Sequence, residues 1–183
     1  MKKLFFVVAL LLVFSIKLSA QSTPEVIDEN NFNYPLINQL ILDKINVKRV
    51  KLRCTALNPD SILYLAAKNQ ADYQVKEDKL THFQKKKQWG DPQKRVEYYH
   101  GEFTAVAENA AMEFWGKQVM EKNKKIHTYT TYEELAEAFV DGWIHSPVHY
   151  TNLSNKIYTT SGIATGIDLK EKKIFAVQVF GRK

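Results

Sequence analysis

The stretch Trp143-Ile144-His145-Ser146-Pro147-Val148-His149-Tyr150-Thr151-Asn152-Leu153 indicates where one helix ends and another begins. Ser146 can cap the second helix, and Pro147 suits its first position, where a backbone N–H would have no partner. His149 is then expected in the first turn of this helix. A junction between two rigid elements is a good place to present a polar side chain to a cavity, so the stretch predicts a functional site as well as a fold.

Four helices are predicted before this junction. Apolar residues recur at helical spacing in three of them, most clearly from Tyr132 to Trp143. In the second helix, alanines at four-residue steps allow close packing on a neighbour. The predicted starts are Asn33, Asn58 before Pro59, Asp91 before Pro92, and Thr131, which forms a capping-box pattern with Glu134.

The C-terminal part of the chain predicts a sheet that is covered on both faces. Two strands are expected at about 160–168 and 173–181, joined as a hairpin, and a shorter strand at 103–107. In the last strand both alternating sets of side chains are apolar, which is typical of a strand packed on each side. We therefore expect an α+β fold, a three-layer α/β/α sandwich with a mainly antiparallel central sheet. Residues 116–130 are polar and are expected to form a loop.

Residues 1–20 have the pattern of a secretory signal peptide. Two lysines precede an apolar run, and Leu18-Ser19-Ala20 is a small-residue cleavage site. The apolar run is shorter than the roughly 20 residues of a membrane span. We therefore expect a secreted or extracytoplasmic protein, periplasmic or extracellular, with no transmembrane span after cleavage. Residues 21–32 are expected to be a flexible lead-in, and residues 33–183 a single domain.

Composition narrows the classes of function. Without residues 1–20 the formal net charge falls from +6 to +3, because three lysines and no acids are lost. No nucleic-acid-binding motif accompanies this ordinary charge, so we expect no nucleic-acid partner. Cys54 is the only cysteine, which rules out an intrachain disulfide and favours a buried, inert thiol. We expect a monomer that is stabilised by packing.

Four motifs, in order along the chain, carry a resemblance to a known family. They are Leu80-Thr81-His82, Ala107-Glu108-Asn109, the Trp143–Leu153 stretch, and Val177-Gln178-Val179-Phe180-Gly181. Each is weak alone. Together they make the chain resemble the CAP superfamily of cysteine-rich secretory, antigen-five and pathogenesis-related proteins, with the bacterial SCP-like pattern at Ser146-Pro147. The resemblance spans about Leu36 to Gly181 and implies the sandwich fold.

The resemblance also implies a central cleft lined by two histidines and two glutamates. His82 and His149 match the histidines, and Glu108 matches the first glutamate. Ser146 stands at the position of the second glutamate, as in bacterial members, so only one carboxylate is present for chemistry. Further candidates for ligand binding are Ser146, Asn152 and Gln178. Asn152 has a structural alternative as a hydrogen-bonding residue at a helix end, and Gln178 can either point into the cleft or satisfy a buried carbonyl.

Two positions depart from glycines of the family pattern. Ala107 precedes Glu108, and Val148 precedes His149. A β-branched residue avoids positive φ, so we expect ordinary helical or extended backbone at both positions.

If two neutral imidazoles and a carboxylate converge, the site can serve three kinds of function. They can hold a divalent metal, zinc by default, with His82 and His149 as ligands and an activated water. They can run general acid–base chemistry, with Glu108 orienting one histidine. They can also simply bind a small molecule, a lipid or an envelope component. Glu108 has a structural alternative, in which its carboxylate ties a loop to backbone N–H groups.

Our leading hypothesis is a secreted binding module for a ligand or divalent metal, with no required cofactor. The alternatives are a metal-dependent extracellular hydrolase that uses the same cleft, and a structural cell-envelope protein with a vestigial cleft. Whether the protein is an enzyme stays open at this point.

Overall fold

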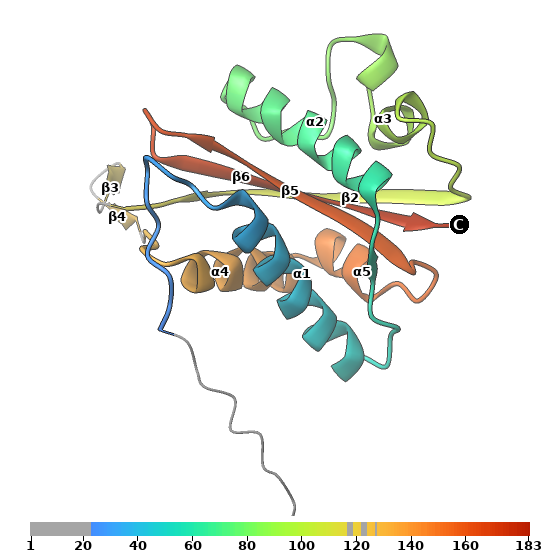
Figure 1. Ribbon diagram of the computed structural model, residues 1–183, viewed down its shortest axis with the longest axis horizontal. Helices are drawn as coiled ribbons and strands as arrows, with labels where there is room; N and C mark the ends of the chain where they lie inside the picture. Colours follow the sequence, from blue (N-terminus) through green and yellow to red (C-terminus); the bar gives the residue numbers. More distant parts are fainter. Residues whose placement is uncertain (1–22, 117–118, 122–123, 127) are drawn as a thin grey trace, which may run out of the picture.

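The computed structural model describes residues 23–116, 119–121, 124–126 and 128–183. The predicted signal peptide lies outside the described residues. The described part of the chain is an α+β fold (Figure 1). Its helices are α1 (Tyr34–Lys51), α2 (Ser61–Glu77), the 3₁₀ turn η1 (Lys87–Trp89), α3 (Pro92–Tyr98), α4 (Tyr132–His145) and α5 (Pro147–Ser154). Its strands are β1 (Asn58–Pro59), β2 (Ala105–Phe114), β3 (Val119–Glu121), β4 (Lys124–Ile126), β5 (Thr160–Asp168) and β6 (Lys173–Arg182).

One mixed sheet has the strand order β1-β5-β6-β2. β5 and β6 form the predicted terminal hairpin, and β6 also pairs antiparallel with β2. Only β1 runs parallel to its neighbour, and it pairs with Thr160 and Ser161 alone. The expectation of a mainly antiparallel sheet is therefore confirmed, with one short parallel strand at an edge. β3 and β4 pair with each other in a separate hairpin.

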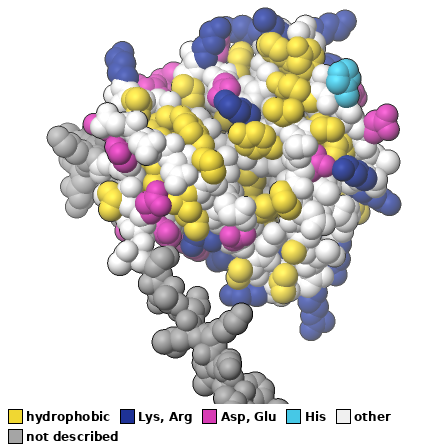
Figure 2. All heavy atoms as spheres, in the orientation of Figure 1, with side chains coloured by type: hydrophobic (Ala, Val, Ile, Leu, Met, Phe, Trp, Pro, Cys, Tyr) yellow, Lys and Arg dark blue, Asp and Glu magenta, His cyan; other side chains and the backbone are white. Residues whose placement is uncertain are grey.

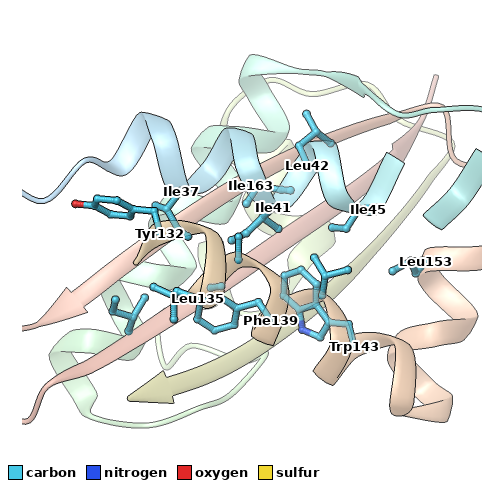
Figure 3. Packing of buried hydrophobic residues seen from close by; sticks show 14 of the residues in the cluster. Ile37, Ile41, Leu42, Ile45, Tyr132, Leu135, Phe139, Trp143, Leu153 and Ile163 are labelled. Atoms are coloured by element: carbon cyan, nitrogen blue, oxygen red, sulfur yellow. The ribbon is translucent and has the colours of Figure 1, made fainter. Parts of the chain in front are cut away.

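Helices cover both faces of this sheet. α1, α4 and α5 lie on one face, and α2 and α3 lie on the other (Figure 1). The larger apolar cluster joins α1 and α4 to the sheet (Figure 3). Figure 3 labels its members Ile37, Ile41, Leu42, Ile45, Tyr132, Leu135, Phe139, Trp143, Leu153 and Ile163. The smaller cluster packs α2 on Ala164, Val177 and Val179, so β6 is buried on both sides as its sequence predicts.

Three predicted helix starts are confirmed by their caps. Each capping side chain accepts a backbone N–H of the first turn, which satisfies a donor that has no partner within the helix. The confirmed caps are Asn33 for α1, Asp91 for α3, and Thr131 with Glu134 as a full capping box for α4.

The predicted start of α2 is wrong by two residues. The cap is Asp60, whose carboxylate accepts two N–H groups of the first turn. Asn58 and Pro59 form β1 instead, because the N–H groups of Asn58 and Asp60 donate to the carbonyls of Thr159 and Ser161. Pairing with a distant strand therefore determines the conformation of Asn58 and Pro59, although the local Asn-Pro sequence favours a helix start.

The predicted strand at 103–107 is too short. β2 runs for ten residues and pairs with β6 along its whole length, so Glu108 and Asn109 lie inside a strand rather than after one. The predicted loop at 116–130 contains β3 and β4. The first error arises because strand pairing between distant segments leaves a weak local signal. The second has a different cause, since β3 and β4 form a local hairpin of three-residue strands, which are too short to show the alternation of a strand.

Two smaller expectations are confirmed. Neither Ala107 nor Val148 has a positive φ. Cys54 is a buried free thiol. In the part of the chain that the structure describes, no helix is long and apolar enough to cross a bilayer.

Candidate functional site

The site is built on β2 and on the segment between α2 and α3. Glu108 lies directly opposite Val179 of β6, and Val179 belongs to the apolar cluster under α2. Because directly opposed residues of an antiparallel pair project to the same face, the Glu108 side chain points toward α2 and α3. His82 follows α2, and Arg95 lies on α3. These elements bring the three side chains to one face of the sheet.

The carboxylate of Glu108 lies between His82 and Arg95. His82 Nδ1 is 2.8 Å from Glu108 Oε1, and Arg95 Nη2 donates to Glu108 Oε2 at 2.5 Å. The side chains of Arg95 and Glu108 are 0% and 1% exposed, whereas that of His82 is 40% exposed. A carboxylate that accepts from Nδ1 favours the tautomer with its proton there, so the Nε2 atom of a neutral His82 keeps its lone pair.

Arg95 is a site residue that the sequence analysis missed. Its Nη1 also donates to the carbonyl oxygens of His82 at 3.2 Å and Trp89 at 3.0 Å, which holds the segment after α2 in place. The seven residues of α3 are too few for a helical period to reveal a buried face. The structural role predicted for Glu108 is contact with backbone N–H groups of a loop. The Glu108 carboxylate instead binds Arg95, which in turn donates to the backbone of the segment after α2.

His149 lies in the first turn of α5, as predicted, and from there its imidazole approaches His82. It is half-buried, and this burial lowers its pKa below the usual 6.5. His82 lies near enough to lower the pKa of His149 further, because two positive imidazoles repel each other. His145 ends α4 on the other side of Pro147, so the two histidines of the His145–His149 spacing belong to different helices.

A chain of amides fastens α5 to β2. Asn109 Nδ2 donates to the carbonyl of His149 at 3.1 Å. Asn152 Nδ2 lies 2.9 Å from Asn109 Oδ1 and 3.3 Å from the carbonyl oxygen of Glu108. These bonds set where His149 lies relative to Glu108. Asn152, a candidate for ligand binding, thus uses its amide nitrogen within the protein.

The structure does not place Gln178 with the carboxylate of Glu108. Gln178 is fully buried and lies opposite Asn109, so its side chain points to the other face of the sheet, where it donates to Ser161 Oγ at 3.0 Å. Ser146 is the N-cap residue of α5, but the predicted capping bond from its side chain is not made. Only its backbone carbonyl takes part, by accepting from the N–H of Tyr150.

The donor set around the two histidines is small. Within the described residues, no group of three or more His, Cys, Asp or Glu side chains is close enough to hold a metal ion. Both oxygens of Glu108 already have partners. A cavity of about 570 Å³ lies between α2 and the segment that follows His82, but His82, Glu108 and His149 do not line it.

The sequence matches the family model CAP, the cysteine-rich secretory protein family, over residues 42–180. The chain therefore belongs to this family, and the resemblance seen in its four motifs is confirmed. No match is found among curated protein sequences.

Solved structures share the fold. An extracellular protein containing an SCP domain from Bacillus anthracis str. Ames has a TM-score of 0.60 at 21% identity, with 82% of this chain and 41% of that chain covered. An outer surface protein from Borrelia burgdorferi has a TM-score of 0.63 at 20% identity, with 88% and 99% covered. NaASP2, solved with Zn²⁺, has a TM-score of 0.54 at 14% identity, with 85% and 83% covered. At these identities the likeness shows the fold alone, and this chain spans less than half of the Bacillus protein.

Proposed function

We propose that this CAP-family chain is an extracytoplasmic binding protein whose ligand contacts His82 and His149. The observation that carries the proposal is the 2.8 Å contact between His82 Nδ1 and Glu108. The carboxylate that makes it is itself held by the buried Arg95. A buried ion pair costs desolvation energy, so its use to orient one half-exposed imidazole supports a role for that imidazole. We take the fold as the three-layer α/β/α sandwich of the family, with the histidines beside the edge strand β2.

The compartment is part of the proposal. Residues 1–20 have the pattern of an export signal, and two proteins of similar fold are named as extracellular and outer surface proteins. A ligand is therefore sought among the ions, lipids and envelope components outside the cytoplasm.

The chemistry of the two imidazoles favours a divalent cation as the first candidate ligand. The pKa of His149 is lowered, so this imidazole is neutral and has a lone pair at neutral pH. Nε2 of His82 has a lone pair as well when Nδ1 donates to Glu108. A histidine whose other ring nitrogen bonds a carboxylate is the usual form of a metal-ligating histidine.

A zinc ion would fit only part of this donor set. His82 and His149 would hold it, and Glu108 would orient His82 without being a ligand. Bound zinc supplies a Lewis acid that lowers the pKa of a bound water. Zinc sites in proteins use three or four side chains as a rule, so a two-histidine site leaves positions for water or for a ligand from outside. Zinc is the first metal to test, because NaASP2, a protein of similar fold, was solved with Zn²⁺.

A hydrolase is the second candidate, because a carboxylate bonded to one ring nitrogen of a histidine is also the arrangement of a general base and its orienting group. The hydrolase hypothesis predicts that His82→Ala abolishes activity on an extracellular substrate while the fold, judged by circular dichroism, is retained. Activity that survives this substitution would remove the hypothesis.

The first experiment is a calorimetric titration of zinc into the full chain, purified in its exported form. The double variant His82→Ala/His149→Ala tests the site, and His145→Ala is the matched control, because His145 is an exposed histidine one helix away. We expect about one zinc per chain in the wild type and in His145→Ala, and none in the double variant. Glu108→Gln should weaken binding roughly 10- to 100-fold, since it removes the carboxylate that orients His82.

Each other result has a definite meaning. Binding that survives in the double variant would place the metal elsewhere. No binding in the wild type would remove both the metal and the metal-dependent hydrolase. A thermal-shift screen with lipids and envelope fragments then tests the binding role. If the three substitutions at His82, Glu108 and His149 change only stability, the site is a vestigial part of a structural protein.

A further inference from the structure

Among the described residues, the β5 edge of the main sheet is unpaired for most of its length, although Ile163 and Thr165 there are only 5% and 3% exposed. β1 covers only Thr160 and Ser161 of β5, and the chain then turns into α2 at Ser61. In the described part of the chain, the remaining residues of β5, 162–168, have no neighbouring strand on that side. An unpaired strand edge presents a row of backbone donors and acceptors, which proteins usually cover or interrupt.

The residues that face this open edge follow from the register. The carbonyl oxygen of Ser161 points to β1, where it accepts from the N–H of Asp60. β5 pairs with β6 without a bulge from Thr160 to Asp168, so the direction of the backbone groups alternates regularly. The N–H and C=O groups of Ile163, Thr165 and Ile167 therefore point outward. Among the described residues, none of these groups has a hydrogen-bond partner outside β6.

The open edge is the floor of a groove between α1 and α2. Two cavities, of about 460 and 330 Å³, reach β5 from this side, and Tyr34, Asn38 and Tyr64 line both, so they adjoin. The first reaches Ile163 and the second reaches Thr165 and Ile167. Hydrophobic side chains are exposed between α1 and α2 on the face drawn in Figure 2.

We propose that this groove binds an extended peptide segment of a partner protein, which adds a strand to the edge of β5. The backbone of an extended peptide has donors and acceptors at alternate residues. These match the outward N–H and C=O groups of Ile163, Thr165 and Ile167. A helix has no free backbone groups along its length. A second copy of this chain cannot pair β5 to β5, because its own β5 also lies between two helices. A flexible segment of about five residues is long enough to span 163–167 at roughly 3.4 Å per residue.

The walls specify the side chains of such a peptide. At the first cavity the walls are apolar, with Pro35, Leu42 and Pro59 beside Ile163, so an apolar peptide residue fits there. At the second cavity Lys68 and Asp72 form an exposed ion pair on α2, where a polar or charged residue fits. This site lies on the opposite edge of the sheet from Glu108, so it is independent of the histidine site.

The test selects a peptide that binds the protein and then measures whether it protects the β5 amides from hydrogen exchange. A phage-displayed library of random dodecapeptides is selected on the full exported chain, and an enriched peptide is synthesised. Amide hydrogen exchange is then followed by NMR with and without that peptide. We expect the amides of Ile163, Thr165 and Ile167 to exchange more slowly in the complex than in the free protein. Their even-numbered neighbours should be protected in both states, because they bond to β6.

The variant Ile167→Pro tests whether the peptide bonds to the backbone of β5. It removes an outward N–H that no group of the described protein accepts, and proline is tolerated at a strand edge. We expect it to weaken the peptide about tenfold, the effect of one lost hydrogen bond. Ile167→Val is the control, because it trims the side chain and keeps the N–H. If Ile167→Pro does not fold, Gln39→Trp fills the same groove from an exposed position on α1 and should reduce binding.

Three results would overturn the proposal. The library yields no binder, or an enriched peptide leaves exchange at the three amides unchanged, or Ile167→Pro and Gln39→Trp both bind as the wild type does. The double variant His82→Ala/His149→Ala should bind the peptide normally. Loss of binding there would assign the peptide to the histidine site instead.

Discussion

The guanidinium of Arg95 lies 2.5 Å from the carboxylate of Glu108, and both side chains are buried. This ion pair joins α3 to the edge strand β2 and positions the only half-exposed member of the group, His82. A buried pair of this kind has an asymmetric energetic effect. The intact pair contributes modestly to stability, whereas the loss of one partner leaves a charge in a dry environment.

Arg95→Met is therefore expected to destabilise the protein by about 3–5 kcal/mol, since it leaves the Glu108 carboxylate without its cation. The free energy of unfolding in urea measures the effect. Lys94→Met is the matched control, because Lys94 is exposed and its ion pair with Asp91 should contribute at most about 1 kcal/mol. Equal effects of the two substitutions would contradict the role given to Arg95.

The pKa of His149 predicts how stability depends on pH. Burial and the nearby His82 make folded His149 bind a proton less readily than the unfolded chain does. Stability from the neutral form is thus complete above the unfolded value of about 6.5 and declines as the pH falls from there toward the lowered pKa. In His149→Gln this part of the acid sensitivity should disappear in urea unfolding at about pH 7.5 and 5.5.

The same pKa can be observed directly. The C2 proton of His149 should titrate in NMR with a midpoint below 6.5, and His82→Ala should raise that midpoint only in part, because burial is the larger cause. A midpoint at or above 6.5 in the wild type would show that the imidazole is not shielded as the structure requires.

Two glycines predict opposite effects of the same substitution. A Cβ on Gly162 of β5 would lie 2.0 Å from the backbone nitrogen of Tyr64, so Gly162→Ala must push α2 off the sheet and should cost about 1–3 kcal/mol or more. A Cβ on Gly142 of α4 meets nothing within 4 Å. Gly142→Ala should therefore stabilise the protein by about 0.5–1 kcal/mol. Thermal unfolding of both variants decides, and a destabilised Gly142→Ala would contradict the packing.

Arg49 is a second buried guanidinium, and it binds no carboxylate of the described residues. Its donors bond the backbone carbonyls of Thr55, Leu153, Asn155 and Tyr158. Arg49→Lys cannot reproduce this planar set of donors, so we expect a loss of about 2 kcal/mol or more in the free energy of unfolding. Arg53→Lys, at an exposed position, should have little effect. A small loss in Arg49→Lys would mean that water replaces the missing bonds.

Local chemistry made much of the fold predictable from sequence. The caps Asn33, Asp91 and Thr131, the proline at the start of α5 and the double apolar alternation of β6 act through neighbours in the chain, so their patterns are visible there. The motif order also identified the family and the three candidate residues His82, Glu108 and His149. Within each cap, strand or motif, the signal depends on residues a few positions apart.

Only the tertiary structure decided how distant segments meet. It showed that Glu108 lies inside β2, that Asn58 and Pro59 pair with β5 rather than cap α2, and that Gln178 points away from the Glu108 carboxylate. It also supplied Arg95, whose partner Glu108 is 13 residues away on another element. The physical reason is common to all of them. Strand pairing, the burial of a charge and an unpaired sheet edge all depend on which residues are neighbours in three dimensions. Those neighbours are far apart in the sequence, so the sequence alone does not reveal them.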